Sequence, residues 1–343
     1  MISYFIDLST LLELKMMFDL KLYKIIYLRY NNYMIEAHNV TKLEGNSLEN
    51  AIKSDFGFNI KNAEKITKGY QSQVYKAILD NEIVFIRINK DPNVFEVEQL
   101  AYKIFEEKGV PVPKIIAYKE KPISIGQPTA IMTSAIGETI SEAKPSQEQN
   151  DIIYEHLGEI LKKINETKLE GFGQLTAKDD ILVGKFSSWN EYCKSQNEHH
   201  NRALEFCVNN NFVTNEDANK IKNIYKEIEQ LDFGKASLLH KDIHQNHFFI
   251  QGSKVTGIID LGSIMAGDPR YDIAMSLVFQ NQRQQEFFKK GYNSDLVYDP
   301  MVNKYMITII IRKLFFRSKQ EINGNIDILL SPLKNSLTKL KQS

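Results

Sequence analysis

Three side chains that can take part in chemistry lie close together in the segment 238–274. Asp242 stands in a polar loop, His247 follows it, and Asp260 ends the apolar run VTGIID. Phosphoryl transfer to an alcohol needs a carboxylate at the attacking hydroxyl, metal ligands beside the phosphates and a cation at the α/β-phosphates. Asp242, His247 and Asp260 can meet the first two needs. The segment therefore predicts phosphoryl transfer, with the cation supplied by another part of the chain.

The elements before this segment predict a small sheet with one helix. Residues 64–90 have the β-rich runs of short strands, and Asp80–Asn81 is suited to a tight turn between two of them. Apolar residues at helical spacing predict a helix over 93–108, ended by glycine and proline. Two further short β-like runs follow at 115–118 and 129–134.

From about residue 150 the pattern becomes helical. Amphipathic helices are predicted over 152–164, 189–206 and 217–231, and another over 305–316. Short β-rich segments interrupt them only within 237–260. A β-rich part followed by a helical part indicates an α+β protein with a cleft between two lobes.

The sequence divides into three parts. Residues 1–34 are rich in Leu, Ile, Tyr and Met, but charged residues interrupt them, so neither a membrane span nor a secretory signal is predicted. We expect the biological start at Met34, with an additional amphipathic helix as the alternative. The N-lobe is expected at 35–135 and the helical C-lobe at 136–343, with a hinge near Thr133–Gly137.

The stretch His240–His247 resembles the catalytic loop of the aminoglycoside phosphotransferase family, which has a protein-kinase-like fold. That loop reads His-x-Asp, four further residues and a metal-binding Asn. The resemblance implies that Asp242 is the catalytic base and that His247 takes the place of the Asn. Aminoglycoside 2″-phosphotransferases and macrolide phosphotransferases are similar in placing His there. Asn246 is the alternative ligand if the loop is shifted by one residue.

Further motifs extend the resemblance over roughly residues 64–330. Asp260, in Ile-Ile-Asp-Leu-Gly, matches the family's second metal ligand, and Asp272 matches the residue that braces the catalytic loop. The segment Gly69–Tyr75 takes the place of the loop that covers the phosphates, where backbone N–H groups and Ser72 would hold phosphate.

The resemblance also supplies the missing cation and a base pocket. Arg87 lies where the family carries Lys or Arg on its third strand, and Glu98 is its expected partner, although helical spacing also permits Glu96. Backbone groups of the segment Met132, Thr133 and Ser134 are expected to read the edge of the nucleotide base. The implied fold has two lobes, a small antiparallel β-sheet N-lobe and a larger, mainly helical C-lobe.

The implied activity is an O-phosphotransferase that uses ATP or GTP with Mg²⁺ on a small hydroxylated substrate. An aminoglycoside-like antibiotic, and thus antibiotic resistance, is the first expectation. Relatives also accept macrolides, homoserine, choline or sugar-like metabolites, and a catalytically silent nucleotide-binding protein is a further alternative. A Ser/Thr protein kinase is disfavoured because no Ala-Pro-Glu motif and no long activation segment follow Asp260.

Two groups of side chains have open roles. Glu155, Glu159, Asp179 and Asp180 form either an amine-binding set or a solvated face, and His199–His200 is expected to be an exposed helix turn.

The composition limits the partners. The 343 residues carry 43 basic and 43 acidic side chains, so no basic surplus points to nucleic acid. We expect no membrane association and a monomer. Cys193 and Cys207 have neither metal-ligand spacing nor a disulfide pattern, which favours the cytoplasm.

Overall fold

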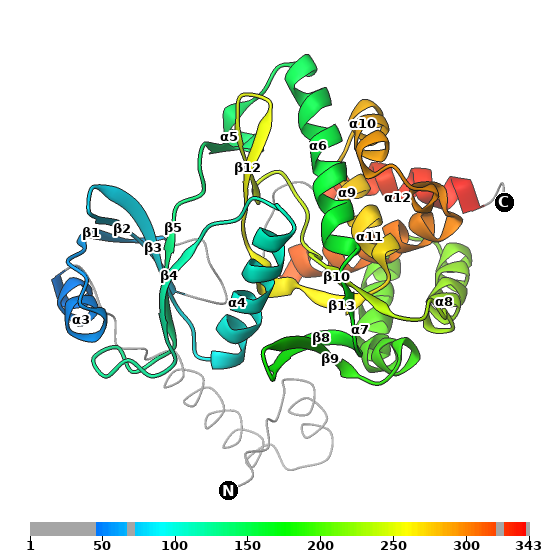
Figure 1. The fold of residues 1–343 in the computed structure, drawn as a ribbon. Coiled ribbons are helices and arrows are strands. Elements are labelled where there is room, and N and C mark those ends of the chain that lie inside the picture. The colour runs from blue at the N-terminus through cyan, green and yellow to red at the C-terminus, as the bar shows by residue number, and fades with distance from the viewer. Residues whose placement is uncertain (1–45, 67–72, 320–325, 341–343) are drawn as a thin grey trace, which may run out of the picture.

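The computed structural model describes residues 46–66, 73–319 and 326–340. The expected extension 1–34 lies outside these ranges. Figure 1 shows a sheet with one covering helix at one end of the molecule and a group of helices at the other. This arrangement confirms the expected α+β, two-lobed class.

The N-lobe is an antiparallel five-stranded sheet in the order β1-β2-β3-β5-β4. The turn between β2 and β3 is the predicted one, since Asp80 and Asn81 both have positive φ, 50° and 69°, as a type I′ turn requires. Tyr75, Ile86 and Ile131 are buried beneath helix α3. The elements are α3 (Asn46–Phe56), β1 (Lys61–Ile66), β2 (Gln73–Leu79), β3 (Glu82–Ile88), β4 (Ile115–Lys119) and β5 (Thr129–Thr133).

Helix α4 (Pro92–Glu107) connects the sheet to the helical lobe. It begins at Pro92 with Asp91 as its cap, because the Asp91 carboxylate accepts a hydrogen bond from the N–H of Asn93. It ends before Gly109, whose φ of 66° is the left-handed conformation that favours glycine. Phe95 and Phe105 on its inner face belong to the core of the helical lobe.

The C-lobe is built mainly from long helices that share one apolar core (Figure 1). The predicted helices are confirmed as α6 (Gln147–Asn165), α7 (Trp189–Asn209), α8 (Asn215–Glu229) and α11 (Pro300–Lys319), and several are longer than the apolar pattern alone indicated. The lobe also contains α5 (Ile140–Ala143), α9 (Pro269–Val278), α10 (Gln282–Tyr292) and α12 (Ile326–Leu340), with short 3-10 turns η1 (Leu261–Ser263) and η2 (Asp295–Tyr298).

Two small sheets in this lobe place the chemical segment. The catalytic loop runs from β10 (Ala236–Leu239) to β11 (Phe248–Gln251), and Asp260 follows β12 (Lys254–Ile258). The two sheets have the orders β7-β10-β13-β8-β9 and β12-β11-β6. Their remaining strands are β6 (Glu138–Thr139), β7 (Lys168–Leu169), β8 (Phe172–Lys178), β9 (Ile181–Phe186) and β13 (Met265–Gly267); the β8–β9 hairpin was not predicted.

The segment that joins the lobes packs against β11 and β12. A Cβ atom on Gly137 would lie 2.0 Å from the carbonyl oxygen of Ile250, so only glycine fits this crossing. Gly257 likewise makes room for Ala135. The Thr256 hydroxyl donates a hydrogen bond to the carbonyl of Ile136. These contacts fix the position of β5 and the segment after it relative to β11 and β12.

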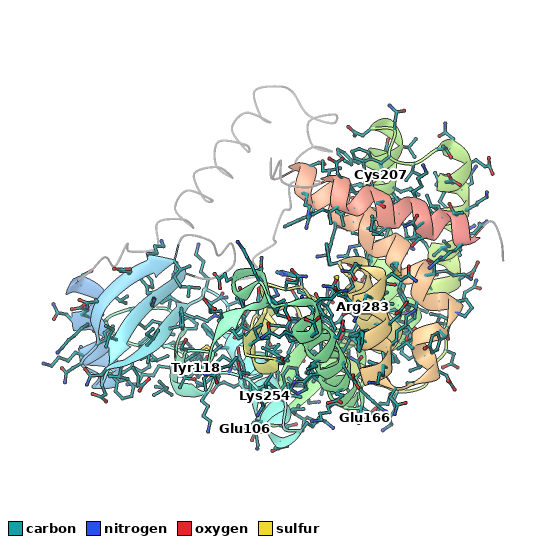
Figure 2. All side chains as sticks on the ribbon, turned by 90° about the horizontal axis from the view of Figure 1, so that it is seen from above. Glu106, Tyr118, Glu166, Cys207, Lys254 and Arg283 are labelled. Carbon is teal, nitrogen blue, oxygen red and sulfur yellow. The ribbon has the colours of Figure 1, made fainter. Side chains whose placement is uncertain are left out.

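Cys193 and Cys207 are free and buried, and Cys207 lies in the helical lobe, far from Tyr118 in the sheet (Figure 2). None of the helices in the described ranges combines the length and the apolar character of a membrane-spanning segment.

Candidate active site

The catalytic loop is held by a buried carboxylate. Asp272, with no exposed surface, accepts hydrogen bonds from the backbone N–H groups of His240 (2.7 Å) and Lys241 (2.8 Å) and from Nδ2 of Asn165 (3.1 Å). Lys241 has a φ of 69°, an uncommon conformation for a residue with a side chain. The predicted bracing role of Asp272 is confirmed, because its bonds keep the backbone just before Asp242 in this conformation.

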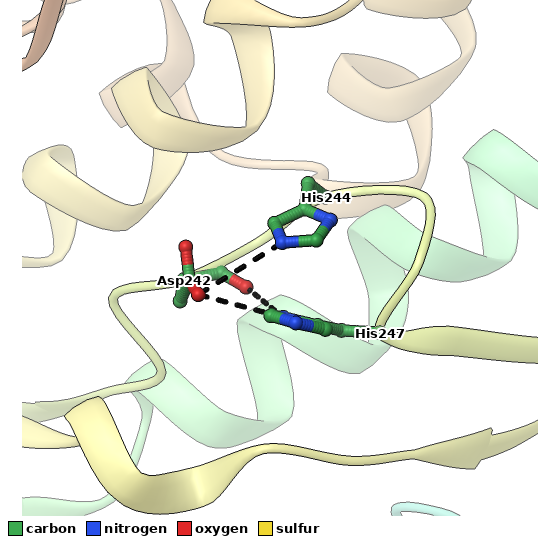
Figure 3. A group of neighbouring side chains, drawn as sticks. All are labelled: Asp242, His244 and His247. Atoms are coloured by element: carbon green, nitrogen blue, oxygen red, sulfur yellow. Dashed lines mark hydrogen bonds and ion pairs between the residues drawn. The ribbon is translucent and has the colours of Figure 1, made fainter. Parts of the chain in front are cut away.

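Asp242 and two histidines form the centre of the site. Figure 3 shows the rings of His244 and His247 turned toward the Asp242 carboxylate. Nδ1 of His247 lies 2.8 Å from the backbone carbonyl of Asp242 and 3.6 Å from Oδ2. His244 packs on His247 with ring centroids 3.7 Å apart, and burial lowers the pKa of His244 to about 4. His244 is therefore uncharged near neutral pH.

The backbone contact determines which nitrogen of His247 can bind a metal. A carbonyl oxygen only accepts, so Nδ1 must carry the proton, and in the neutral ring the lone pair is then on Nε2. Nε2 lies 3.5 Å from Oδ2 of Asp260. Asp260 is half exposed and has a φ of 65° at the end of the strand segment. The two atoms are close enough to share one divalent cation, so these residues fit a metal site.

The alternative ligand, Asn246, is oriented differently. Its Oδ1 accepts a hydrogen bond from the Ser141 hydroxyl at 2.5 Å, and its side chain is exposed. The shift of one residue that would bring Asn246 to the metal position is absent from this loop.

The predicted cation and its partner form a buried pair. Arg87 Nη1 and Nη2 contact the Glu98 carboxylate at 2.5 and 3.0 Å, so the pair is bidentate, and Glu98 is 1% exposed. Burial alone would lower the pKa of Arg87, but the Glu98 carboxylate outweighs it and raises that pKa. The charge of Asp260 also raises the Arg87 pKa, which places this pair near the expected metal ligands. Glu98, rather than Glu96, is the partner.

Two backbone N–H groups of the expected base-binding segment already donate hydrogen bonds to neighbouring backbone carbonyls. Met132 is buried in β5, and the N–H groups of Thr133 and Ser134 donate to the carbonyls of Lys114 and Ile83. A nucleotide base that contacts these two residues would therefore meet carbonyl groups and side chains. The expected phosphate contact, Ser72, lies outside the described residues.

The sequence reasoning missed Lys313 on α11. Its Nζ lies 3.5 Å from Oδ1 of Asp242. Burial raises the pKa of Asp242, but Lys313, followed by His247 and His244, outweighs burial and lowers that pKa below its usual range. A signal was present, since Arg312 and Lys313 interrupt the apolar run IIIRKLFF.

Replacing Lys313 by Met should move the acid limb of the pH profile of kcat/KM toward neutral pH. Asp242 must be ionised to accept a hydrogen bond from the acceptor, and without Lys313 its burial is less compensated, so its pKa rises. Steady-state rates from neutral pH down to the lowest pH at which the protein stays folded measure the shift. Lys304→Met, which removes a cation of the same helix that pairs with Glu227, is the control. If the acid limb of Lys313→Met stays where it is in the wild type, Lys313 does not lower the pKa of Asp242.

Of the four acidic residues with open roles, Glu159, Asp179 and Asp180 have exposed side chains. Glu155 pairs with Lys290 at 2.8 Å, and Asp179 and Asp180 have the positive φ angles of the β8–β9 turn. Within α7, His199 is exposed as expected, but His200 is half-buried.

The model of the family described as "Phosphotransferase enzyme family" (APH) matches residues 62–299. No curated protein matches the sequence.

Solved structures show the same fold at low identity. A thermostable mutant of aminoglycoside phosphotransferase APH(4)-Ia, in ternary complex with ADP and hygromycin B, is 18% identical, with a TM-score of 0.65 over 85% of this chain and 98% of that chain. The GDP complex of wild-type aminoglycoside 2'-phosphotransferase-IIIa is 15% identical (TM-score 0.57, 84% and 97%). Spectinomycin phosphotransferase APH(9)-Ia with ADP and spectinomycin is 15% identical (TM-score 0.57, 86% and 95%). Together with the match over residues 62–299, these structures identify the chain as a member of the APH phosphotransferase enzyme family.

Proposed function

We propose that this protein transfers the γ-phosphoryl group of ATP or GTP to an alcohol oxygen of a small molecule, in a reaction that requires Mg²⁺. One observation carries the proposal: His247 contacts both Asp242 and Asp260, and the charge of Asp260 acts on the Arg87–Glu98 pair of the other lobe. Phosphoryl transfer depends mainly on positioning and charge stabilisation, which such a meeting of groups supplies.

Asp242 is placed to orient the acceptor. Its ionised carboxylate accepts a hydrogen bond from the substrate hydroxyl and takes the proton as the new P–O bond forms. Because Lys313 and the histidines lower the Asp242 pKa, the carboxylate is ionised at neutral pH and is a weak base. We infer that orientation of the hydroxyl contributes more than early proton removal.

The remaining residues hold the nucleotide phosphates. Nε2 of His247 and Oδ2 of Asp260 are the proposed protein ligands of Mg²⁺. When bound, the metal ion neutralises the charge that develops on the phosphate oxygens. Arg87, fixed by Glu98, is the proposed contact to the α/β-phosphates. We retain the division into a nucleotide-binding lobe (35–135) and a helical lobe (136–343) as part of this proposal, together with a cytoplasmic monomer.

A nucleotide-consumption screen tests the function. The full-length protein is assayed with ATP and with GTP against hygromycin B, spectinomycin, a macrolide, homoserine, choline, sugars and hydroxy acids. We expect acceptor-dependent release of ADP or GDP that disappears with EDTA and returns with excess Mg²⁺. Mass spectrometry should show the addition of one phosphoryl group to the acceptor. The proposal is wrong if the protein binds no nucleotide and shows no acceptor-dependent turnover under any of these conditions.

A further inference from the structure

A second feature lies beside the catalytic loop, in the helical lobe. A pocket of about 500 Å³, with the space open to solvent included, is lined by side chains of α7, α8, α9, α11 and β13. Its enclosed part has room for only a few small groups. Five of its lining residues are aromatic: Trp189, Tyr192, Tyr225, Tyr271 and Tyr305. The wall also carries polar side chains, those of Gln196, Asn197, His200, Thr308 and Arg312. Aromatic walls with a few polar groups are typical of a small-molecule site.

The pocket carries positive charge. Among its lining residues in the described chain, Arg312 is the ionised one and none is acidic. His200 lines the pocket uncharged, since burial lowers its pKa to about 3. Arg312 has neither a hydrogen bond nor a salt bridge to any residue that the structure describes. Charged groups that are partly removed from water are normally paired, so this guanidinium indicates an anionic ligand.

A second cation lies close to Arg312. Lys241 is on the catalytic loop, and its pKa is lowered to about 8, first by burial and then by the charge of Arg312. Within the described ranges its ammonium group also has no salt bridge. Two cations that repel each other beside an aromatic wall are unfavourable alone, and an anion between them would remove the repulsion.

An unpaired hydroxyl supports the same conclusion. Tyr225 OH is buried in the pocket wall without a hydrogen-bond partner, and its ring stacks on His200 with centroids 4.9 Å apart. The phenol groups of Tyr305 and Tyr192, by contrast, contact Asp268 and Met265. A ligand with acceptor oxygens would satisfy Tyr225 as well as Arg312.

The pocket borders the reacting centre. Arg312 precedes Lys313, which contacts Asp242, and Tyr271 precedes Asp272, which holds the catalytic loop. The charges of Asp242 and Arg312 both reach Lys241. A molecule that binds Arg312 at one end and extends past Lys241 would therefore bring its other end toward Asp242.

We propose that the acceptor is a hydroxylated carboxylic acid, whose carboxylate binds Arg312 in this pocket, on the side of Lys241, while its hydroxyl meets Asp242. This inference rests on the proposed function and gives the substrate class for the same site. Arg312 offers the planar, bidentate donor geometry that carboxylates prefer. A polycationic aminoglycoside would meet Arg312 in the pocket and the charge of Lys241 beside it, which is electrostatically unfavourable.

The chain's single tryptophan provides a binding assay that needs no turnover. Trp189 lines the pocket, so its fluorescence reports a ligand there directly. The full-length protein is titrated with lactate, mandelate and phenyllactate, and with the uncharged amide of each acid. We expect a saturable change with at least one acid and roughly 10-fold or more weaker binding of the matching amide, as for a hydrogen bond to a charged group.

Two variants test whether Arg312 binds the carboxylate of the acid. Arg312→Gln should weaken the acid by roughly 10-fold or more and leave the amide unchanged. Arg202→Gln, which removes an exposed arginine paired with Glu198 on α7, should bind like the wild type. No saturable response to any of the acids, or equal binding of acid and amide in wild type and Arg312→Gln, overturns the inference.

Turnover separates this inference from the proposed function. If the acids bind but no nucleotide is consumed with any acceptor, the proposed function fails and the anion pocket stands. If hygromycin B is phosphorylated while the acids neither bind nor react, the function stands and the carboxylate acceptor is wrong.

Discussion

Replacing Asp242 by Ala should abolish acceptor-dependent phosphorylation and leave nucleotide binding largely intact. In the proposed function this carboxylate orients the attacking hydroxyl, whereas the proposed nucleotide contacts come from Arg87, Asp260 and His247. Loss of a positioned catalytic carboxylate lowers kcat by roughly 10²–10⁴-fold. Product release in a coupled assay measures the rate, and calorimetric titration with the non-hydrolysable nucleotide measures binding.

A matched control lies in the same loop. Asn246→Ala removes an exposed side chain whose bond goes to Ser141, so kcat should stay within about threefold of wild type, as for a surface change of less than about 0.5 kcal/mol. Thermal unfolding of both variants separates a catalytic loss from a folding defect. Unchanged turnover in Asp242→Ala would show that this carboxylate is not the group that receives the acceptor.

The grouping of side chains around Asp242 has a local cause. His240, Asp242, His247 and Asp260 lie on one continuous segment from β10 through β11 and β12, so their spacing along the chain largely determines their spacing in space. Arg87 and Glu98 were predictable for a similar reason, because a strand and the helix directly after it carry them. Side chains that lie on one short segment therefore stay close together in the folded protein, and their grouping can be predicted from the sequence.

Lys313 and Arg312 illustrate what sequence reasoning could not supply. Both lie on α11, whose contact with the catalytic loop depends on the packing of the whole helical lobe. Apolar periodicity predicts that a helix is buried on one face but not which loop its polar residues will meet. The β8–β9 hairpin was missed because Gly171, Gly173 and Gly184, which allow the two strands to cross closely, weaken the strand pattern.

The packing of the helical lobe also determines which charged side chains are paired and which are left to bind a ligand. Acidic residues on α6 and the β8–β9 turn were candidates for an amine-binding set, yet Glu155 is neutralised by Lys290 from α10. The unpaired charges beside the reacting centre are instead positive, on Arg312 and Lys241. A neutral total of 43 basic and 43 acidic residues thus conceals a cationic pocket.

Replacing Asp272 by Ala should destabilise the protein by on the order of 3–5 kcal/mol and inactivate the remaining folded fraction. Three donors, the N–H groups of His240 and Lys241 and Nδ2 of Asn165, would lose their acceptor in a fully buried position. Each buried donor without a partner costs about 1–3 kcal/mol. The loop that carries Asp242 would also lose the bonds that hold Lys241 in its left-handed conformation.

Asp272→Asn distinguishes the lost acceptor from a lost volume. The amide keeps the size of the carboxylate but replaces one acceptor oxygen with an NH₂ group, which would face a backbone N–H instead of accepting from it. Its stability, measured by urea unfolding, should therefore fall between that of wild type and Asp272→Ala. Asp295→Ala, an exposed carboxylate far along the same lobe, should change stability by less than about 0.5 kcal/mol. If Asp272→Asn equals wild type in both stability and kcat, the loop is held by packing and not by these hydrogen bonds.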